Sequence, residues 1–274
     1  MSRRGLVISN PMAVTNNGLH IKNTNLDRQE LRANLLFWDV LDFPKNNLLG
    51  IGPDDDTAFL ISAGVIQQTT ISLNGSFEMG QAALTTYLNA FRYRESQEPG
   101  AWSISTGENS LNFPSDQVDD GRGVLVKLFH AIPVPDKEVP LADILEFRTK
   151  RRAELIALRH HLEETYQRII ISGDGPLALT TELEKLQQAI SDHIKVSRET
   201  GFKLRLQDLS ADLNLTGFAG TALTSYHLGL PVLESLLAGA ASSLSINIGR
   251  SLKGRAVSSN PYRYVTSFHQ QLFV

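Results

Sequence analysis

The chain has 274 residues, of which 42% are hydrophobic and 20% charged, and its formal net charge is -3. This composition excludes a largely disordered chain and is long enough for one large domain or two smaller ones. The small negative charge argues against a surface that binds nucleic acid or anionic membranes over its whole area. There is no cysteine, which excludes disulfides, thiolate metal sites and a cysteine nucleophile and is compatible with the cytoplasm.

The first 135 residues are predicted to form a mixed α and β region, which begins with a short buried strand over residues 5–8. Asp27 followed by Glu30 is typical of the first turn of a helix, because an aspartate there accepts a backbone hydrogen bond. Apolar residues then recur at helical spacing, at Leu31, Leu35, Trp38 and Leu41, before Pro44. The sequence therefore predicts an amphipathic helix that includes Leu41.

Turn residues and short apolar runs predict the remaining elements of this region. One helix is expected between the three aspartates Asp54, Asp55 and Asp56 and Gly64, and a longer one from about Phe77 to Tyr93. Strands are expected over residues 65–73, 102–105 and 124–132. A linker marked by prolines follows, and we place the boundary between this region and a second, helical region, residues 136–274, inside it.

A long antiparallel helical hairpin is predicted over residues 141–200. Its first arm carries apolar residues at the three-four spacing of a helix seam, at Leu155, Leu158, Leu162, Tyr166 and Ile169. Its second arm repeats the pattern at Leu179, Leu183, Leu186, Ile190 and Ile194. Because the sequence SGDGP between the arms is typical of a tight turn, the two seams are expected to face each other.

Residues 213–250 form a nearly uncharged segment in which small residues recur at every fourth position on both sides of Pro231. One row consists of Gly217, Thr221, Ser225 and Gly229, and the other of Ser235, Gly239 and Ser243. At 3.6 residues per turn, such rows let two helix backbones approach closely. We therefore predict two closely packed helices here, followed by a short C-terminal helix over residues 261–273.

Three surroundings are open for this segment. Packing inside the protein fits the small-residue rows, and an oligomer interface fits helices that are apolar most of the way round. Conditional insertion into a membrane fits the apolar composition, but Pro231 interrupts the segment, and His227 and Glu234 lie near its middle. The sequence favours packing inside the protein over the other two.

The three aspartates Asp54, Asp55 and Asp56 are candidate ligands for a divalent cation, because clustered carboxylates are hard oxygen ligands. Acidic residues at the start of a helix also complement its N-terminal backbone groups, and we favour this simpler interpretation. We therefore predict no metal site. No other constellation has the spacing of a catalytic motif, so the sequence assigns no catalytic residue and no cofactor.

The basic run Arg148, Lys150, Arg151 and Arg152 is a candidate for contacts with phosphates. Acidic residues on the same helix weaken its field, so a solvated helix face with internal ion pairs is the favoured alternative. A metal-dependent nuclease is a third interpretation, in which Asp136 would act with Glu146 and Lys150. The last two lie four residues apart, and this spacing fits an ion pair within a helix.

Five islands of sequence carry a resemblance to a known family: GLVISNP, LLFWDVLDFP, FLISAGVIQQ, VPLADILEFRTKRRAELIALRHHL and NPYRYVTSF. In this order they resemble an uncharacterised bacterial family of unknown function, and they cover both halves of the chain. The resemblance implies no activity or catalytic residue. It implies an association with mobile or anti-phage loci.

Together these patterns predict an α+β protein in the cytoplasm. We expect a non-enzymatic interaction or assembly protein, a subunit or sensor of a bacterial multi-protein system that associates with itself or a protein partner, with antiviral defence as its setting. Nucleic acid is a weaker candidate partner, and a membrane only a conditional one. The alternatives are a membrane-acting effector that uses residues 213–250 and a metal-dependent nuclease.

Overall fold

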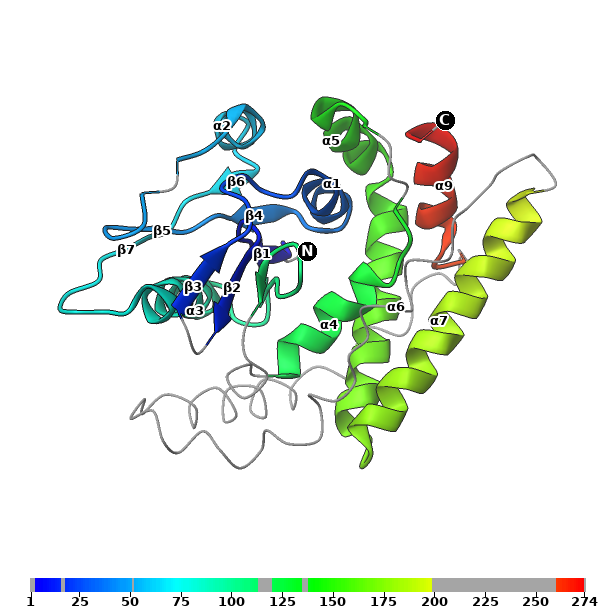
Figure 1. Ribbon diagram of the computed structural model, residues 1–274. Coiled ribbons are helices and arrows are strands. Elements are labelled where there is room, and N and C mark those ends of the chain that lie inside the picture. Colours follow the sequence, from blue (N-terminus) through cyan, green and yellow to red (C-terminus); the bar gives the residue numbers. More distant parts are fainter. Residues whose placement is uncertain are drawn as a thin grey trace.

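The computed structural model of the protein describes residues 3–15, 18–50, 52–112, 120–134, 138–198 and 260–273. The predicted α+β class is confirmed, because a mixed region at the N-terminus is followed by helices (Figure 1). The segment 213–250, with both small-residue rows, lies outside the described residues, as does the end of the predicted hairpin after residue 198.

The centre of the N-terminal region is a parallel sheet of four short strands: β1 (Gly5–Val7), β4 (Val40–Asp42), β6 (Ile66–Gln67) and β8 (Trp102–Ile104). Their spatial order is β6-β4-β1-β8, and every neighbouring pair is parallel. In the register, Leu6 of β1 lies between Leu41 of β4 and Ser103 of β8. All three residues of β1 are buried, as expected of a strand that has a neighbour on each edge and helices on both faces.

Helices cover the two faces of this sheet in a fixed order. Leu6 and Leu41 pack in the same buried cluster as α1 (Arg28–Phe37) and α2 (Asp55–Ser62). The alternate residues of the strands face the opposite way and pack with α3 (Met79–Gln97). The connections from β1 to β4 and from β4 to β6 run through α1 and α2 over one face of the sheet, and the connection from β6 to β8 runs through α3 over the other face. The chain thus moves outward from β1 in one direction and later returns to its other side, so the order of the strands reverses between β1 and β8.

Two smaller sheets flank the central one. In the first, β2 (Met12–Thr15) pairs with β3 (Gly18–Ile21) in an antiparallel hairpin and with β9 (Leu111–Asn112) in parallel. The second contains β5 (Lys45–Asn46) and β7 (Thr70–Ile71). Both extend the α3 side of the molecule, where β2 and β3 contact α3.

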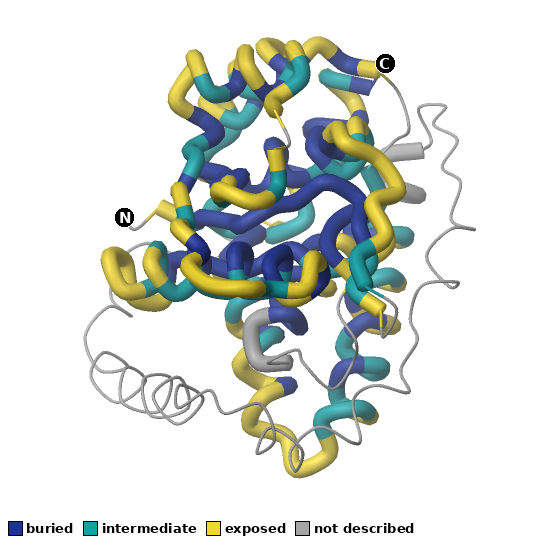
Figure 2. The backbone as a smooth tube through the Cα atoms, turned by 60° about the vertical axis from the view of Figure 1, so that its left-hand side comes forward, coloured by how far each residue is buried: buried dark blue, intermediate teal, exposed yellow. Residues whose placement is uncertain are grey.

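The remaining helices form the second half of the structure: α4 (Asp120–His130), α5 (Leu141–Lys150), α6 (Arg152–Ile171), α7 (Gly175–Arg198) and α9 (Arg263–Gln271). The predicted antiparallel hairpin is confirmed over α6 and α7, which pack side by side (Figure 1). Its first arm was expected to begin at residue 141, but residues 141–150 form the separate helix α5, and Arg151, with φ -103° and ψ 21°, divides the two helices. The buried seam residues are Leu155, Leu158, Leu162, Ile169, Leu179, Leu183, Leu186 and Ile190. One hydrophobic core contains residues of α1, α4, α6, α7 and α9 together. Figure 2 shows the buried residues in the sheet and the helix faces around it, and exposed ones at the hairpin tip.

Three further predicted elements were wrong in type or extent. Residues 124–132 were expected as a strand, but they belong to helix α4 and the turn after it. Over the part of α4 whose burial is described, residues 123–130, Lys127 and His130 are the exposed positions. They lie three residues apart, as on one side of a helix, and the buried residues around them gave the run its strand-like apolar character.

The predicted helix through Leu41 ends at Phe37, and Leu41 lies in β4 instead. Trp38 already has an extended backbone, with φ -114° and ψ 142°. The predicted strand over residues 65–73 is divided into β6 and β7, which pair with different partners. In both cases a continuous apolar run crosses the boundary between two elements, so hydrophobic spacing alone could not locate it.

No helix in the described ranges has the combination of length and apolar composition needed to cross a membrane.

Helix α9 is the short C-terminal helix predicted over residues 261–273, and it is anchored in the core. Tyr264 donates a hydrogen bond to the carbonyl oxygen of Leu36 at 2.8 Å, and Phe268 lies edge-on to Phe37 at 6.1 Å between ring centroids. His269 is 2% exposed, and its Nε2 donates to the carbonyl oxygen of Pro133 at 2.9 Å. The end of the chain therefore stabilises the end of α1 and the loop after α4.

His269 should make the stability of the protein depend on pH. Burial lowers the pKa of its imidazole from 6.5 to about 4, more strongly than the Pro133 hydrogen bond raises it. Between these values the unfolded chain binds a proton that the folded protein does not, so stability falls as the pH decreases from 6.5 to 4. We expect a loss of up to about 3 kcal/mol in this window, measured by urea unfolding, and a much smaller loss in His269→Gln. An identical pH dependence of the two proteins would contradict this assignment.

Candidate functional site

The carboxyl edge of the parallel sheet, between β1 and β8, is where the direction of the connections reverses. In open sheets of this kind, ligands bind outside the carboxyl ends of the strands at such a point. Polar residues follow both strands here: Ser9 and Asn10 come after β1, separated from it by Ile8, and Ser105 comes directly after β8. All three are buried, although polar side chains of this kind are mostly exposed in proteins.

The first turns of α1 lie beside this edge. The Asp27 carboxylate accepts a hydrogen bond from the backbone N–H of Glu30 at 2.8 Å, which confirms the predicted start of the helix. The Glu30 carboxylate accepts a hydrogen bond from the Ser105 hydroxyl at 2.9 Å. Because Ser105 follows β8, this contact holds the start of α1 against the end of that strand.

A small cavity of about 10 Å³ opens between these elements, which is room for one water-sized group. It is lined by Ile8, Ser9, Leu26, Asp27, Glu30, Leu31, Asn34 and Asn109. Asn34 lies on α1, one turn after Glu30. The lining thus has an apolar part, Ile8, Leu26 and Leu31, and a polar part that includes Ser9, Asn34 and the carboxylates of Asp27 and Glu30.

Two polar atoms of this lining have no hydrogen-bond partner among the described residues, the hydroxyl oxygen of Ser9 and Oδ1 of Asn34. Both residues are 3% exposed. Next to them, Asn10 donates from Nδ2 to the carbonyl oxygen of Asn23 at 2.7 Å, but its Oδ1 is also unpartnered. Each such buried atom costs about 1–3 kcal/mol, so three of them at one strand end require an explanation.

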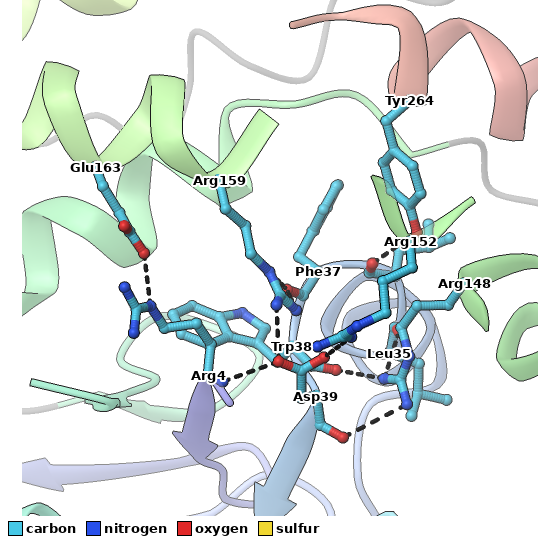
Figure 3. A network of polar contacts seen from close by, with 11 residues as sticks. Arg4, Leu35, Phe37, Trp38, Asp39, Arg148, Arg152, Arg159, Glu163 and Tyr264 are labelled. Atoms are coloured by element: carbon cyan, nitrogen blue, oxygen red, sulfur yellow. Dashed lines mark hydrogen bonds and ion pairs between the residues drawn. The ribbon is translucent and has the colours of Figure 1, made fainter. Parts of the chain in front are cut away.

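A second polar cluster lies at the opposite, amino edge of the sheet (Figure 3). Asp39, directly before β4, accepts hydrogen bonds from the backbone N–H of Arg4 at 2.9 Å, from Arg159 at 2.7 Å and from Arg152 at 2.6 Å. The side chain of Arg4 pairs with Glu163 of α6 at 2.6 Å. We call this set of residues, together with Arg148, the amino-edge cluster.

Arginines of the amino-edge cluster also bind the end of α1. Arg148 donates to the carbonyl oxygens of Leu35 and Trp38, and Arg159 donates to that of Phe37 at 2.9 Å. The last carbonyls of a helix carry partial negative charge and have no partner within the helix. Side chains from α5 and α6 therefore cap α1 and join the helical half of the protein to the sheet.

Opposing effects act on the ionisation of Asp39, whose carboxylate is 5% exposed. Burial acts to raise its pKa, but the hydrogen bonds from Arg159 and Arg152 outweigh burial and hold the pKa well below its ordinary value. The carboxylate therefore stays ionised at neutral pH and balances part of the positive charge of the arginines.

The four basic residues predicted as candidates for phosphate contacts occupy different environments. Arg148 and Arg152 belong to the amino-edge cluster, where Arg148 binds the carbonyl oxygen of Trp38 and the partly exposed Arg152 pairs with Asp39. Arg151 pairs with Glu154 at 3.0 Å, and Lys150 is exposed. The structure thus does not bring the four together as one basic surface.

The three aspartates Asp54, Asp55 and Asp56 all lie at the N-terminus of α2, as the favoured interpretation predicted. Asp54 caps the helix by accepting a hydrogen bond from the backbone N–H of Thr57 at 2.9 Å, and Asp55 and Asp56 lie in the first turn. Within the described ranges, no group of three or more histidine, cysteine, aspartate or glutamate side chains could hold a metal ion. Glu146 and Lys150 both lie on α5.

The predicted packing residues Gly217, Thr221, Ser225, Gly229, Ser235, Gly239 and Ser243 lie outside the described residues. The described part of the helical half has its own exposed apolar surface at the hairpin tip. Ile170, Ile171 and Leu177 are 47%, 83% and 63% exposed.

We call the cavity and the polar residues around it, Ser9, Asn10, Asp27, Glu30, Asn34 and Ser105, the carboxyl-edge site. The sequence did not predict it. A usable signal was present in the polar pair Ser9 and Asn10 directly after a predicted buried strand, because strand ends are frequent ligand positions. Nothing local in the sequence could have added Ser105, which reaches the site only through the order of the strands.

A family model described as a family of unknown function, DUF6236, matches residues 9–273. No curated protein and no solved structure matches the chain. The predicted resemblance to an uncharacterised family is therefore confirmed.

The amino-edge cluster should be a main source of stability. Replacing the carboxylate in Asp39→Asn leaves Arg159 buried without its counter-charge, and we expect a loss of about 3–5 kcal/mol in the free energy of unfolding. Because the pKa of Asp39 is lowered in the folded protein, this contribution is complete above its ordinary value of 3.8, decreases progressively as the pH falls below 3.8, and is lost only below the lowered pKa of the folded state.

Urea unfolding at pH 7 measures the first effect, and a partial decrease of the difference between wild type and variant at pH 3 measures the second. The exposed Asp55→Asn is the matched control, with an expected change within about 0.5 kcal/mol. If Asp39→Asn were no less stable than this control at pH 7, the cluster would not have the role assigned to it.

Proposed function

Since the chain belongs to the DUF6236 family of unknown function, we propose from its geometry that the protein is a non-enzymatic ligand-binding subunit or sensor. Its ligand site is the cavity at the carboxyl edge of the sheet. Its helical half is the part that responds to the ligand and makes contacts with a partner.

The observation that carries this proposal is the pair of unpartnered oxygens, of Ser9 and Asn34, in one cavity at the reversal point of the sheet. A protein that used this region only for stability would gain from apolar residues there. Groups that are kept polar at a cost in stability are typical of binding sites.

The lining favours binding over catalysis. It offers one hydroxyl, two amides and two carboxylates, but neither a histidine nor a lysine, which are the usual partners of an activated nucleophile or a general base near neutral pH. Glu30 and Asp27 already accept hydrogen bonds that position α1.

Helix α1 provides a physical connection between the ligand site and the helical half. Its first turns contribute Asp27, Glu30 and Asn34 to the cavity, and its last carbonyls are held by Arg148 and Arg159. The helix is 10 residues long, or roughly 15 Å at 1.5 Å per residue. A ligand that shifts the start of α1 would therefore also move the arginine contacts of α5 and α6.

Other roles stay predictions. A protein partner or self-association, a place in a bacterial multi-protein system, antiviral defence and a cytoplasmic location extend the proposal without a described contact that carries them. The membrane-acting effector depends on residues 213–250, outside the described residues. The metal-dependent nuclease also stays a prediction, because Asp136 lies outside the described residues; Glu146 and Lys150 share one helix, α5.

A stability comparison tests the proposed site without knowledge of the ligand. Asn34→Leu replaces an unpartnered amide with an apolar group of similar shape, so we expect the ligand-free protein to gain about 1–3 kcal/mol. The protein is refolded from denaturant before urea unfolding, so that no small molecule is carried along.

Asn46→Leu is the matched control, because the Asn46 side chain donates to Thr86 at 2.7 Å and accepts from two backbone N–H groups. This variant should lose stability. If Asn34→Leu lost stability to the same extent, Asn34 would have a structural role and the proposed site would be wrong.

A further inference from the structure

We infer that the carboxyl-edge site binds a protonated primary amine, the NH₃⁺ group of a small organic molecule. The inference rests on the proposed function, because it names the class of ligand for the same cavity. It follows from the charge of the lining, from its hydrogen-bonding atoms, and from its size.

The charge of the lining favours a cation. Two carboxylates, Asp27 and Glu30, line the cavity, and no lysine, arginine or histidine does. Arg28, the basic neighbour of Asp27, pairs with Glu138 outside the cavity. The N-terminus of α1 contributes only about half a positive charge, which is less than the two negative charges of the carboxylates. A carboxylate or phosphate ligand would therefore be repelled.

The hydrogen-bonding atoms fit the same group. An ammonium group has three donors and no acceptor. The cavity offers the oxygens of Ser9 and Asn34, which have no partner among the described residues, and the carboxylate of Glu30. A carboxylate can accept about four hydrogen bonds, so the one from Ser105 leaves room for another. The residues that line the cavity thus carry at least three such acceptors, as many as an ammonium group has donors.

The size and lining of the cavity exclude two other kinds of cation. A quaternary ammonium is bulkier and is recognised by aromatic side chains, none of which lines this cavity. A calcium ion requires six to eight oxygen ligands, and no group of three or more metal-binding side chains occurs among the described residues. A primary ammonium has nearly the size of water, and the remainder of its molecule can extend past the exposed Asn109.

The experiment is a titration of the ¹⁵N-labelled full chain, followed by NMR through the side-chain amide of Asn34 and the backbone amide of Glu30. Four probes are compared at equal ionic strength: ethylammonium, tetramethylammonium, acetate and calcium chloride. We expect saturable shifts of these two signals with ethylammonium and at least tenfold weaker binding of the other three.

Variants separate the site from its surroundings. Glu30→Gln, which keeps an acceptor for Ser105 but removes the charge, should weaken ethylammonium binding at least tenfold. Glu108→Gln is the matched control, because Glu108 pairs with Lys22 outside the cavity lining, and it should bind as the wild type does.

The outcomes distinguish this inference from the proposed function. If acetate, calcium or tetramethylammonium shifted the two signals more strongly than ethylammonium, the site would stand and the ligand class would be wrong. If no probe shifted them, or if Glu30→Gln bound ethylammonium as well as the wild type, the amine assignment would be overturned. The proposed site itself fails only if Asn34→Leu also loses stability as Asn46→Leu does.

Discussion

The contact between the amino-edge cluster and the end of α1 is the interaction on which the rest of the structure depends. Arg148 and Arg159 bind the last carbonyls of α1, and Asp39 anchors Arg152 and Arg159 at the start of β4. One set of ion pairs and hydrogen bonds thus fixes the first helix, the central sheet and the helices of the second half against one another. The hydrophobic core around Phe37 and Tyr264 lies next to these polar contacts.

The two edges of the sheet are consequently different in kind. At the amino edge, the charges of Asp39 and Arg159 are paired and buried, as expected of a structural joint. At the carboxyl edge, the oxygens of Ser9 and Asn34 are buried but unpartnered. Helix α1 has one end at each edge. This arrangement supports a protein in which a ligand at one edge acts on helices held at the other.

Local patterns were sufficient to predict elements whose signals lie close together in the sequence. The Asp27 cap, the strand β1 and the α6–α7 hairpin each depend on neighbouring residues in the sequence. The charged run at residues 148–152 shows why the rest could not be predicted. Its positive charge was evident from the sequence, but the partners of Arg148 and Arg152 lie about 110 residues earlier in the chain. Likewise, Ser105 reaches Glu30 only because β8 lies next to β1.

The central claim is that the carboxyl-edge cavity holds part of a ligand. An atomic-resolution crystal structure of the full chain, purified under native conditions from a cell that normally makes it, tests this claim most directly. We expect electron density larger than a water molecule within hydrogen-bond distance of the Ser9 hydroxyl and the Asn34 side chain, continuing outward past Asn109. A single ordered water that bridges Ser9 and Asn34, with no density beyond it, would contradict the account.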